Sequence, residues 1–272
     1  MCIVVYKPEN VEFPSWETLK TCFAHNPNGA GFMWADGKTV NIRKGFMTWN
    51  EFKKALKPYK NDSKLPFVMH FRITTHGGTS QGLTHPFPLT ASTRKLKELN
   101  CKADVGIAHN GIISMCSSAK NLSDTAEFVR DYLTLLVKSP RYYQNHKICD
   151  IIEELIGSKM CILSNDMHAE VIGSGWKIDN GIYYSNTSFQ KAVVKAGKKK
   201  TSGYYGIYDS YSDDYYTNWK GGYEDAYADE CCMCGMPLDY YKGYCEVDGY
   251  ALCEDCAKEY FGENTVKVSD RR

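Results

Sequence analysis

The chain has 272 residues, enough to bury a core of ordinary size, and this length fits one large domain or one domain with a small module. Hydrophobic residues make up 43% and charged residues 24%, and the net charge of +1 excludes a global basic field for nucleic acid or anionic lipid. No run of about 18 apolar residues is present, so no transmembrane helix is predicted. The start, MCIVVYKPENVEF, lacks the basic and apolar regions of a secretory signal, and we expect a cytoplasmic protein.

Residues 1–195 are predicted to form one mixed α/β domain, because short β-rich runs alternate with helical patterns. The pair Asp36-Gly37 tolerates positive φ and predicts a tight hairpin between two of these runs. The expected strands are Cys2–Tyr6, Gly31–Ala35, Thr39–Arg43, Pro66–Arg72, Val105–His109, Lys159–Leu163 and His168–Ile172.

Two helices are predicted in the second half of this domain. The first begins after Ser123 and Asp124, carries an apolar stripe from Phe128 to Leu136 and ends before Pro140. The second spans about Lys147–Ile156 and ends at Gly157, a residue typical of helix C-termini.

Residues 196–229 form a linker by composition, since the chain changes to Gly, Ser, Asp and Tyr after a run of three lysines. Few aliphatic residues are present to offset the entropy of ordering this backbone. A stacking platform for single-stranded nucleic acid is the alternative, because seven aromatic side chains lie between Tyr204 and Trp219. The acidic residues of the segment would repel phosphate, which favours the linker.

Cys2 follows the initiator methionine, and we expect removal of Met1 to expose it as the N-terminal residue. It would then carry a thiol and an α-amine whose ordinary pKa, about 7.7–8.0, suits a proton acceptor near neutral pH. A thiol activated by its own amine corresponds to the N-terminal threonine nucleophiles. From this position alone, a buried and inert cysteine in a strand is the favoured interpretation, so other residues must decide.

Four further segments accompany Cys2: HFRITTHGG at 70–78, HNG at 109–111, SDT at 123–125 and HPF at 85–87. With MCIVV and the glycine-containing NPNGAGF they resemble, in order and approximate spacing, the class II glutamine amidotransferases, which are N-terminal nucleophile hydrolases. The resemblance covers about the first 190 residues. It implies an α+β fold, the four-layer αββα sandwich of these hydrolases, followed by a small C-terminal zinc-binding module.

The resemblance implies a role for each matching residue. Arg72 would bind the α-carboxylate of glutamine through two parallel hydrogen bonds, and Thr75 and His76 would lie beside it. An arginine in a surface ion pair and a packed histidine are the alternatives. Asp124 would receive the substrate ammonium. From the local pattern, an Asp before a helix with Glu127 three residues later is typical of an N-cap.

Asn110 and Gly111 match the oxyanion hole of the family, in which an Asn side-chain amide and the next backbone N–H face the developing negative oxygen. An Asn-Gly pair between apolar runs is equally typical of a tight hairpin turn. Together with Cys2 as nucleophile, these residues imply a glutaminase that forms a γ-glutamyl thioester and releases ammonia.

The C-terminal cysteines predict a metal site. Six of the twelve cysteines lie between Cys231 and Cys256, and two CxxC pairs are separated by 18 residues, with an Asp248-Gly249 turn between them. Four thiolates satisfy one tetrahedral Zn²⁺, so we expect a structural zinc module over residues 230–264. Cys232 and Cys245 compete for ligand positions, and a disulfide or an iron–sulfur cluster is disfavoured. The predicted ligands are Cys231, Cys234, Cys253 and Cys256.

No ammonia-accepting synthase domain is recognisable in the sequence. The resemblance therefore implies a glutaminase subunit that hydrolyses glutamine and supplies ammonia to an acceptor enzyme on a separate chain, without a membrane partner. A freestanding glutaminase is a second version. The non-enzymatic alternative is an inactive scaffold of the same fold that uses its zinc module to contact protein or nucleic acid.

Overall fold

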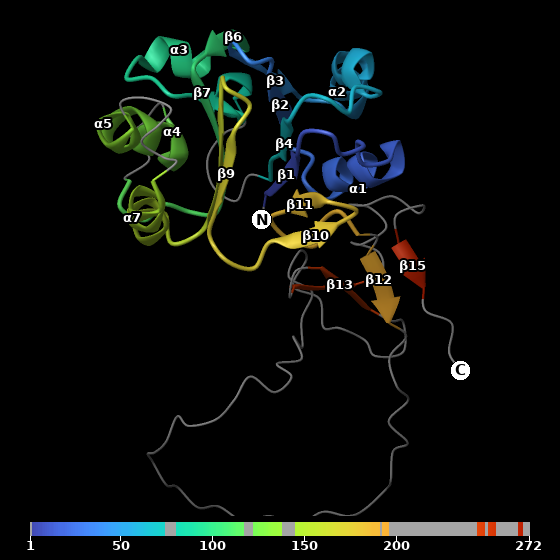
Figure 1. The fold of residues 1–272 in the computed structure, drawn as a ribbon. Coiled ribbons are helices and arrows are strands. Elements are labelled where there is room, and N and C mark those ends of the chain that lie inside the picture. Colours follow the sequence, from blue (N-terminus) through green and yellow to red (C-terminus); the bar gives the residue numbers. More distant parts are fainter. Residues whose placement is uncertain are drawn as a thin grey trace, which may run out of the picture. The chain divides into compact units, whose positions relative to one another are not determined.

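The computed structural model describes residues 2–73, 80–116, 122–137 and 145–190, and the backbone of strands at 192–195, 244–247, 250–253 and 266–268. The chain divides into two compact units, Met1–Lys191 and Ala192–Arg272. The first unit contains the described helices and two antiparallel sheets (Figure 1). Among the residues that the structure describes, no helix is long and apolar enough to cross a membrane.

The N-terminal strand lies in the interior of the larger sheet of the first unit. Strand β1 (Ile3–Lys7) pairs with β4 on one side and β11 on the other, so both ends of the unit's sequence meet there. The seven strands lie in the order β10 (Lys177–Asp179), β11 (Ile182–Tyr184), β1, β4 (Phe67–Phe71), β2 (Ala30–Ala35), β3 (Val40–Phe46) and β6 (Asn100–Ala103).

The smaller sheet has β7 (Val105–Asn110) and β8 (Lys159–Ser164) at its centre, and every residue of β7 is buried. Its order is β5 (Phe87–Pro88), β7, β8 and β9 (Ala169–Ile172). The two sheets pack through an apolar cluster to which the larger sheet contributes Val4, Met33 and Val68, and the smaller one Ala108 and Leu163. A side chain at Gly106 would meet Met33 Sδ at 2.4 Å, so this glycine permits the close approach of the sheets.

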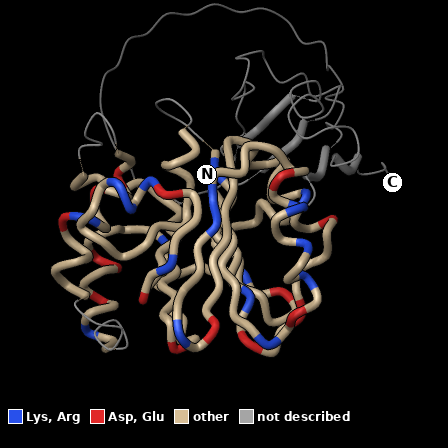
Figure 2. Tube along the Cα trace, turned by 90° about the horizontal axis from the view of Figure 1, so that it is seen from above, with Lys and Arg blue, Asp and Glu red and all other residues tan. Residues whose placement is uncertain are grey.

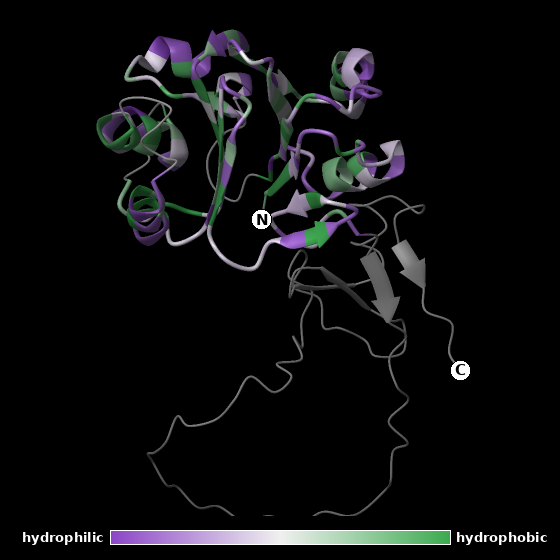
Figure 3. Cartoon of the chain, viewed as in Figure 1, coloured by the Kyte–Doolittle hydropathy of each residue, from purple (hydrophilic) through white to green (hydrophobic). Residues whose placement is uncertain are grey.

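Helices cover the outer faces of both sheets (Figures 1 and 3). On the larger sheet, α1 (Trp16–His25) and α2 (Trp49–Leu56) bury Leu19 and Phe52 against Phe32 and Phe71. Short polar residues start them: Ser15 caps α1, and Thr48 with Glu51 forms a capping box on α2. Neither helix was predicted. The short helices η1 (Lys57–Tyr59), η2 (Gln81–Leu83) and α3 (Thr93–Lys97) lie in the connections.

The two predicted helices pack on the smaller sheet, where they bury Phe128, Leu133 and Ile152 beside Ile162. The first is longer than one regular α-helix: α4 (Asp124–Phe128) continues through a π-helical turn, η3 (Val129–Leu133), into α5 (Thr134–Leu136). The second, α7 (His146–Ile156), ends at Gly157 with a φ of 57°, as predicted.

The predicted strands are confirmed with boundaries shifted by a few residues. The hairpin at Asp36-Gly37 is also confirmed: Asp36 Oδ1 accepts from the backbone N–H groups of Lys38 and Thr39, and Gly37 has a φ of 82°. Charged residues of both signs are interspersed over the first unit (Figure 2).

In the second unit the described backbone forms a sheet in the order β14 (Tyr250–Cys253), β13 (Tyr244–Val247), β12 (Ala192–Lys195) and β15 (Val266–Val268). Strands β13 and β14 are antiparallel, with Val247 opposite Tyr250; the predicted turn residues, Asp248 and Gly249, lie outside the described residues. Strand β12 precedes the predicted linker 196–229, so the sheet joins residues on both sides of that segment.

Candidate active site

Cys2 lies directly before β1, between two neighbouring segments of the chain. Its thiol donates to the carbonyl of Ile73 with a sulfur–oxygen distance of 3.5 Å, and its own carbonyl accepts from Asn186 Nδ2 at 2.8 Å. Burial raises the pKa of the Cys2 thiol, although the positive charges of the N-terminus and Arg72 act in the opposite direction. The thiol is therefore protonated at neutral pH, and its use as a nucleophile requires a base.

Arg72 follows the last residue of β4, one position before the carbonyl that contacts Cys2. Its backbone continues the sheet, because its N–H donates to the carbonyl of Gly29 and its carbonyl accepts from the N–H of Asn28, both at 2.8 Å. The guanidinium Nη1 is buried and has no acceptor among the described residues. A buried donor without a partner is costly, and a bound carboxylate would satisfy it.

Asn110 is the last residue of β7 and is 6% exposed. Its side-chain amide lies 3.0 Å from Ser185 Oγ, and the same hydroxyl oxygen accepts from the N–H of Val4 at 2.9 Å. One hydroxyl thus joins Asn110 to the strand that begins beside Cys2. The chain continues from Asn110 through a loop to α4, so the alternative prediction of a hairpin turn at Asn110-Gly111 is wrong.

Gly111 has a φ of +154° and lies against Ser158, whose Cβ would be 2.3 Å from a Cβ on this residue. Only glycine fits here. The neighbouring His109 fixes the surroundings, since its Nε2 lies 2.7 Å from Ser158 Oγ and its Nδ1 lies 2.9 Å from Thr125 Oγ1. The backbone around Gly111 is therefore held by the side chains of Thr125 in α4 and of Ser158, two residues after the end of α7.

Asp124 occupies the first position of α4, and Ser123 is the N-cap, whose hydroxyl accepts from the N–H of Ala126 at 3.2 Å. The alternative prediction of Asp124 as the N-cap is wrong. Its two carboxylate oxygens accept from the N–H groups of Ile113 and Thr125 at 2.8 and 2.7 Å. Asp124 therefore connects the loop after Gly111 to α4; Oδ1 also accepts from the Thr125 hydroxyl at 3.4 Å, and among the described residues Oδ2 has only the Ile113 N–H as a donor.

Buried histidines lie next to these residues. His70 Nε2 is 3.1 Å from the carbonyl of His109, and the rings of His70 and His85 lie 4.2 Å apart. Burial lowers the pKa of His70 to about 3 and that of His109 to about 4, so both are neutral near pH 7. Their role in the geometry is to support the strand ends that carry Arg72 and Asn110.

The structure brings Cys2, Arg72, Asn110 and Gly111 to one end of the two sheets, with Asp124 bonded to the adjoining loop. The sequence did not predict the roles of Ser185 and Asn186, which form hydrogen bonds with Asn110 and Cys2 respectively. The only signal in the sequence is a short polar cluster, SNTS, directly after a strand.

Several predicted positions lie outside the described residues. Thr75 and His76 belong to a segment, 74–79, that the structure does not describe. The structure also does not describe Cys231, Cys234 and Cys256. Of Cys253, which ends β14, it describes the backbone but not the side chain. Within the described ranges, no group of three or more His, Cys, Asp or Glu residues is arranged to hold a metal ion.

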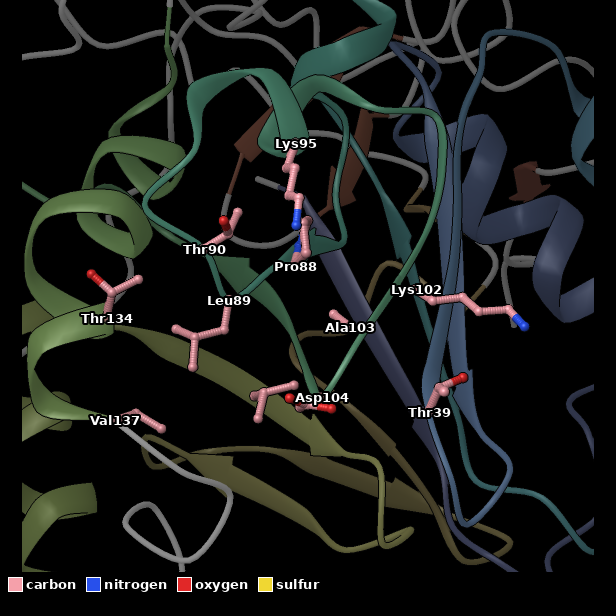
Figure 4. Close-up of a pocket in the computed structure, with 11 residues that line it drawn as sticks. Thr39, Pro88, Leu89, Thr90, Lys95, Lys102, Ala103, Asp104, Thr134 and Val137 are labelled. Atoms are coloured by element: carbon pink, nitrogen blue, oxygen red, sulfur yellow. The ribbon is translucent and has the colours of Figure 1, made fainter.

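A cavity of about 600 Å³ opens at the opposite end of β7, beside Val105 rather than Asn110 (Figure 4). Lys95 extends toward Pro88 in this cavity, whereas Lys102 points away. None of the predicted catalytic or substrate-binding residues lines it. Because a strand rises about 3.3 Å per residue, the length of β7 separates this cavity from the Cys2 site.

No family model matches the chain, and no curated protein sequence matches it. Among solved structures it is similar to a glutamine phosphoribosylpyrophosphate amidotransferase from B. subtilis complexed with ADP and GMP, with 17% identity, 70% of this chain covered and a TM-score of 0.44. It is also similar to a structure described as the allosteric regulatory enzyme of purine biosynthesis, with 18% identity, 70% coverage and a TM-score of 0.45. The chain spans 42% of the length of each.

Proposed function

We propose that the first unit is a glutaminase of the class II glutamine amidotransferase kind, with the four-layer αββα sandwich of the N-terminal nucleophile hydrolases. Cys2 is the nucleophile after removal of Met1. The single observation that carries the proposal is the convergence at Cys2: the thiol contacts the residue after Arg72, and one hydroxyl links β1 to Asn110.

In the proposed reaction, the α-amine of mature Cys2 takes the thiol proton as the sulfur attacks the side-chain carbonyl carbon of glutamine. The carbonyl oxygen becomes an oxyanion and accepts hydrogen bonds from the Asn110 amide and the Gly111 N–H. The Cys2 ammonium then returns the proton to the departing nitrogen, which leaves as ammonia. The remaining thioester is cleaved when water loses a proton to the same amine, and glutamate and the free thiol are released.

The state of the thiol supports this use of the amine. Burial raises the pKa of Cys2, so a thiolate is scarce at neutral pH and the proton must leave during the attack. The α-amine of mature Cys2 is the nearest proton acceptor to the thiol, because both groups belong to the same residue. Of the neutral histidines nearby, His109 uses both ring nitrogens in contacts with Thr125 and Ser158, and His70 uses Nε2 in a contact with the His109 carbonyl.

Two charges hold glutamine in this proposal. The α-carboxylate binds Arg72, whose buried Nη1 has no acceptor among the described residues. The α-ammonium binds Asp124, whose carboxylate also accepts from the loop that follows the oxyanion hole. Recognition of both charges positions the side-chain amide at the thiol and excludes substrates that lack either group. Thr75 and His76 are proposed to complete the carboxylate site.

The decisive experiment measures ammonia release from glutamine by purified protein whose N-terminus has been determined by intact mass. Wild-type protein lacking Met1 is expected to release ammonia and to be labelled on Cys2 by a thiol-trapping glutamine analogue. Cys2→Ala is expected to lose activity by at least about 10⁴-fold, as for other removed nucleophiles. Cys101→Ala is the matched control, because this cysteine is also partly buried but lies on the edge strand β6. Full activity of Cys2→Ala would contradict the proposal.

We further propose that the second unit binds one structural Zn²⁺ through Cys231, Cys234, Cys253 and Cys256, and that it docks a separate enzyme that consumes the ammonia. The β13–β14 hairpin supports a zinc module, because it places Cys253 at the end of a strand after the predicted turn. Native mass spectrometry is expected to find one zinc per chain, and Cys253→Ser is expected to lose it. A chain that purifies without zinc and is unaffected by chelators would contradict this part.

A further inference from the structure

Ser185 follows β11 and is completely buried. Its backbone N–H donates to the carbonyl of Val4 at 2.9 Å, so the residue extends the pairing of β11 with β1. Its carbonyl accepts from Lys159 Nζ at 2.5 Å. Lys159 is the residue of β8 that lies directly opposite Asn110. Both the backbone and the side chain of Ser185 therefore connect the N-terminal strand to the end of β7.

The hydrogen bonds of the Ser185 hydroxyl decide which way the Asn110 amide points. The oxygen accepts from the N–H of Val4, which uses one of its lone pairs. With the Asn110 nitrogen toward Ser185, the hydroxyl proton has no acceptor among the described residues, and Asn110 Oδ1 is buried without a donor. Two buried polar groups are then unsatisfied.

A rotation of the amide by 180° gives both of these groups a partner and leaves the N–H donors of Asn110 without an acceptor among the described residues. The oxygen and nitrogen of an Asn amide are nearly identical in shape, so their assignment follows from the hydrogen-bond network. In the rotated form the Ser185 hydroxyl donates to Asn110 Oδ1 and still accepts from the N–H of Val4. Both N–H bonds of the amide are then free at the buried position where Oδ1 had no partner.

We propose that Ser185 is a positioning residue that holds the Asn110 amide with its nitrogen toward the substrate carbonyl. The proposal rests on the proposed glutaminase function, since the free N–H groups are those that an oxyanion requires. Ser185 touches no reacting atom. It acts by fixing one of two amide orientations, only one of which presents donors to the developing charge.

The test is a double-mutant cycle on Ser185 and Asn110 with kcat and KM for glutamine as readouts. Asn110→Ala is expected to lower kcat about 10²- to 10³-fold. Ser185→Ala is expected to lower kcat about 10- to 100-fold with KM nearly unchanged, because the residues proposed to hold glutamine are intact. In the Asn110→Ala background, Ser185→Ala is expected to cost less than about twofold, since no amide remains to be oriented.

Equal losses in both backgrounds would overturn the proposal, because Ser185 would then act without Asn110. A loss confined to KM would overturn it as well. If Ser185→Ala does not fold, as judged by thermal unfolding, Ser185→Cys in reducing buffer takes its place, since a thiol of similar shape is a weak donor. Its kcat is expected to fall about tenfold, and an unchanged kcat would overturn the proposal. Absence of ammonia release by wild-type protein would instead refute the proposed function and, with it, the role of Ser185.

Discussion

Strands β1 and β4 pair from Ile3 opposite Phe71 to Lys7 opposite Phe67, and a basic residue with a buried nitrogen lies at each end of this ladder. At one end, Lys7 is completely buried. Its Nζ donates to the carbonyls of Ser63 and Leu65 at 2.6 and 2.7 Å and to that of Asp62 at 3.3 Å. At the other end, Arg72 Nη1 is buried with no acceptor among the described residues.

The difference separates a structural cation from one available to a ligand. Lys7 exchanges its hydration for protein carbonyls, even though burial lowers its pKa to about 8. Arg72 has lost water from Nη1 and gained nothing in return from the described residues. A site that is incomplete without substrate binds that substrate more tightly, because the unpaired donor is satisfied only in the complex.

The largest effect is expected from Arg72→Ala, which should lower kcat/KM for glutamine about 10²- to 10³-fold, mainly through KM. The free energy of unfolding should change by less than about 1 kcal/mol, since no hydrogen bond of Nη1 is lost in the free protein. Steady-state kinetics and urea unfolding measure both. Arg72→Lys should be intermediate, because the charge remains without the planar fork.

Lys7→Met tests the opposite end of the ladder. The variant removes one donor from three partly buried carbonyls, of which that of Ser63 keeps the N–H of Asn10, and we expect the free energy of unfolding to fall by about 2–4 kcal/mol. Urea titration measures the loss, and kcat/KM of the folded variant should stay within about threefold of wild type. A stable but inactive Lys7→Met variant would contradict the purely structural role of Lys7.

Asp124→Asn is expected to have a smaller effect on activity. The Asn side chain has one oxygen, so it can accept from only one of the N–H groups of Ile113 and Thr125 at this geometry. It also lacks the counter-charge for the ammonium, so kcat/KM should fall about 10- to 100-fold. Competition by glutarate semi-amides that lack the ammonium provides the control, since their binding should be insensitive to the change. An unaltered kcat/KM would leave Asp124 with a purely structural role.

The last expected effect concerns pH. Burial lowers the pKa of His109 to about 4, below the ordinary value of about 6.5, so the unfolded chain binds its proton first. Stability from this histidine is complete above pH 6.5 and declines as pH falls toward 4, by about 1.4 kcal/mol per pH unit. His70 adds to the same decline. Urea unfolding at pH 7, 6 and 5 measures the slope, and a flat profile would mean that these histidines are not buried in solution.

The elements with strong apolar periodicity were predictable from the sequence. Strand β7 follows from a short apolar run that is buried, helix α7 from aliphatic residues at helical spacing, of which Ile152 and Ile156 are buried, and the β2–β3 hairpin from the Asp36-Gly37 pair. Helices α1 and α2 were missed because their apolar faces consist of few residues interrupted by charged and polar ones. Their capping residues, Ser15 and Thr48, were the available signals.

The local patterns at two site residues favoured structures that the fold does not adopt. Asn110-Gly111 matches a hairpin, but β7 pairs with β8, which is distant in sequence. Asp124 matches an N-cap, but Ser123 takes that position and Asp124 reaches back to Ile113. Ser185 was unpredictable, because its partners Val4 and Asn110 are 181 and 75 residues away. Tertiary contacts at such separations leave no local signature.

The attachment of Cys2 to Asn186 has a consequence for biosynthesis. Translation delivers the first strand long before β11 and the residues after it, so the amino terminus remains accessible to a methionine aminopeptidase while most of the unit is still being made. Closure of the sheet by β11 then brings Asn186 to the carbonyl of Cys2. The site proposed at Cys2 is therefore completed only after both ends of the unit's sequence have been made.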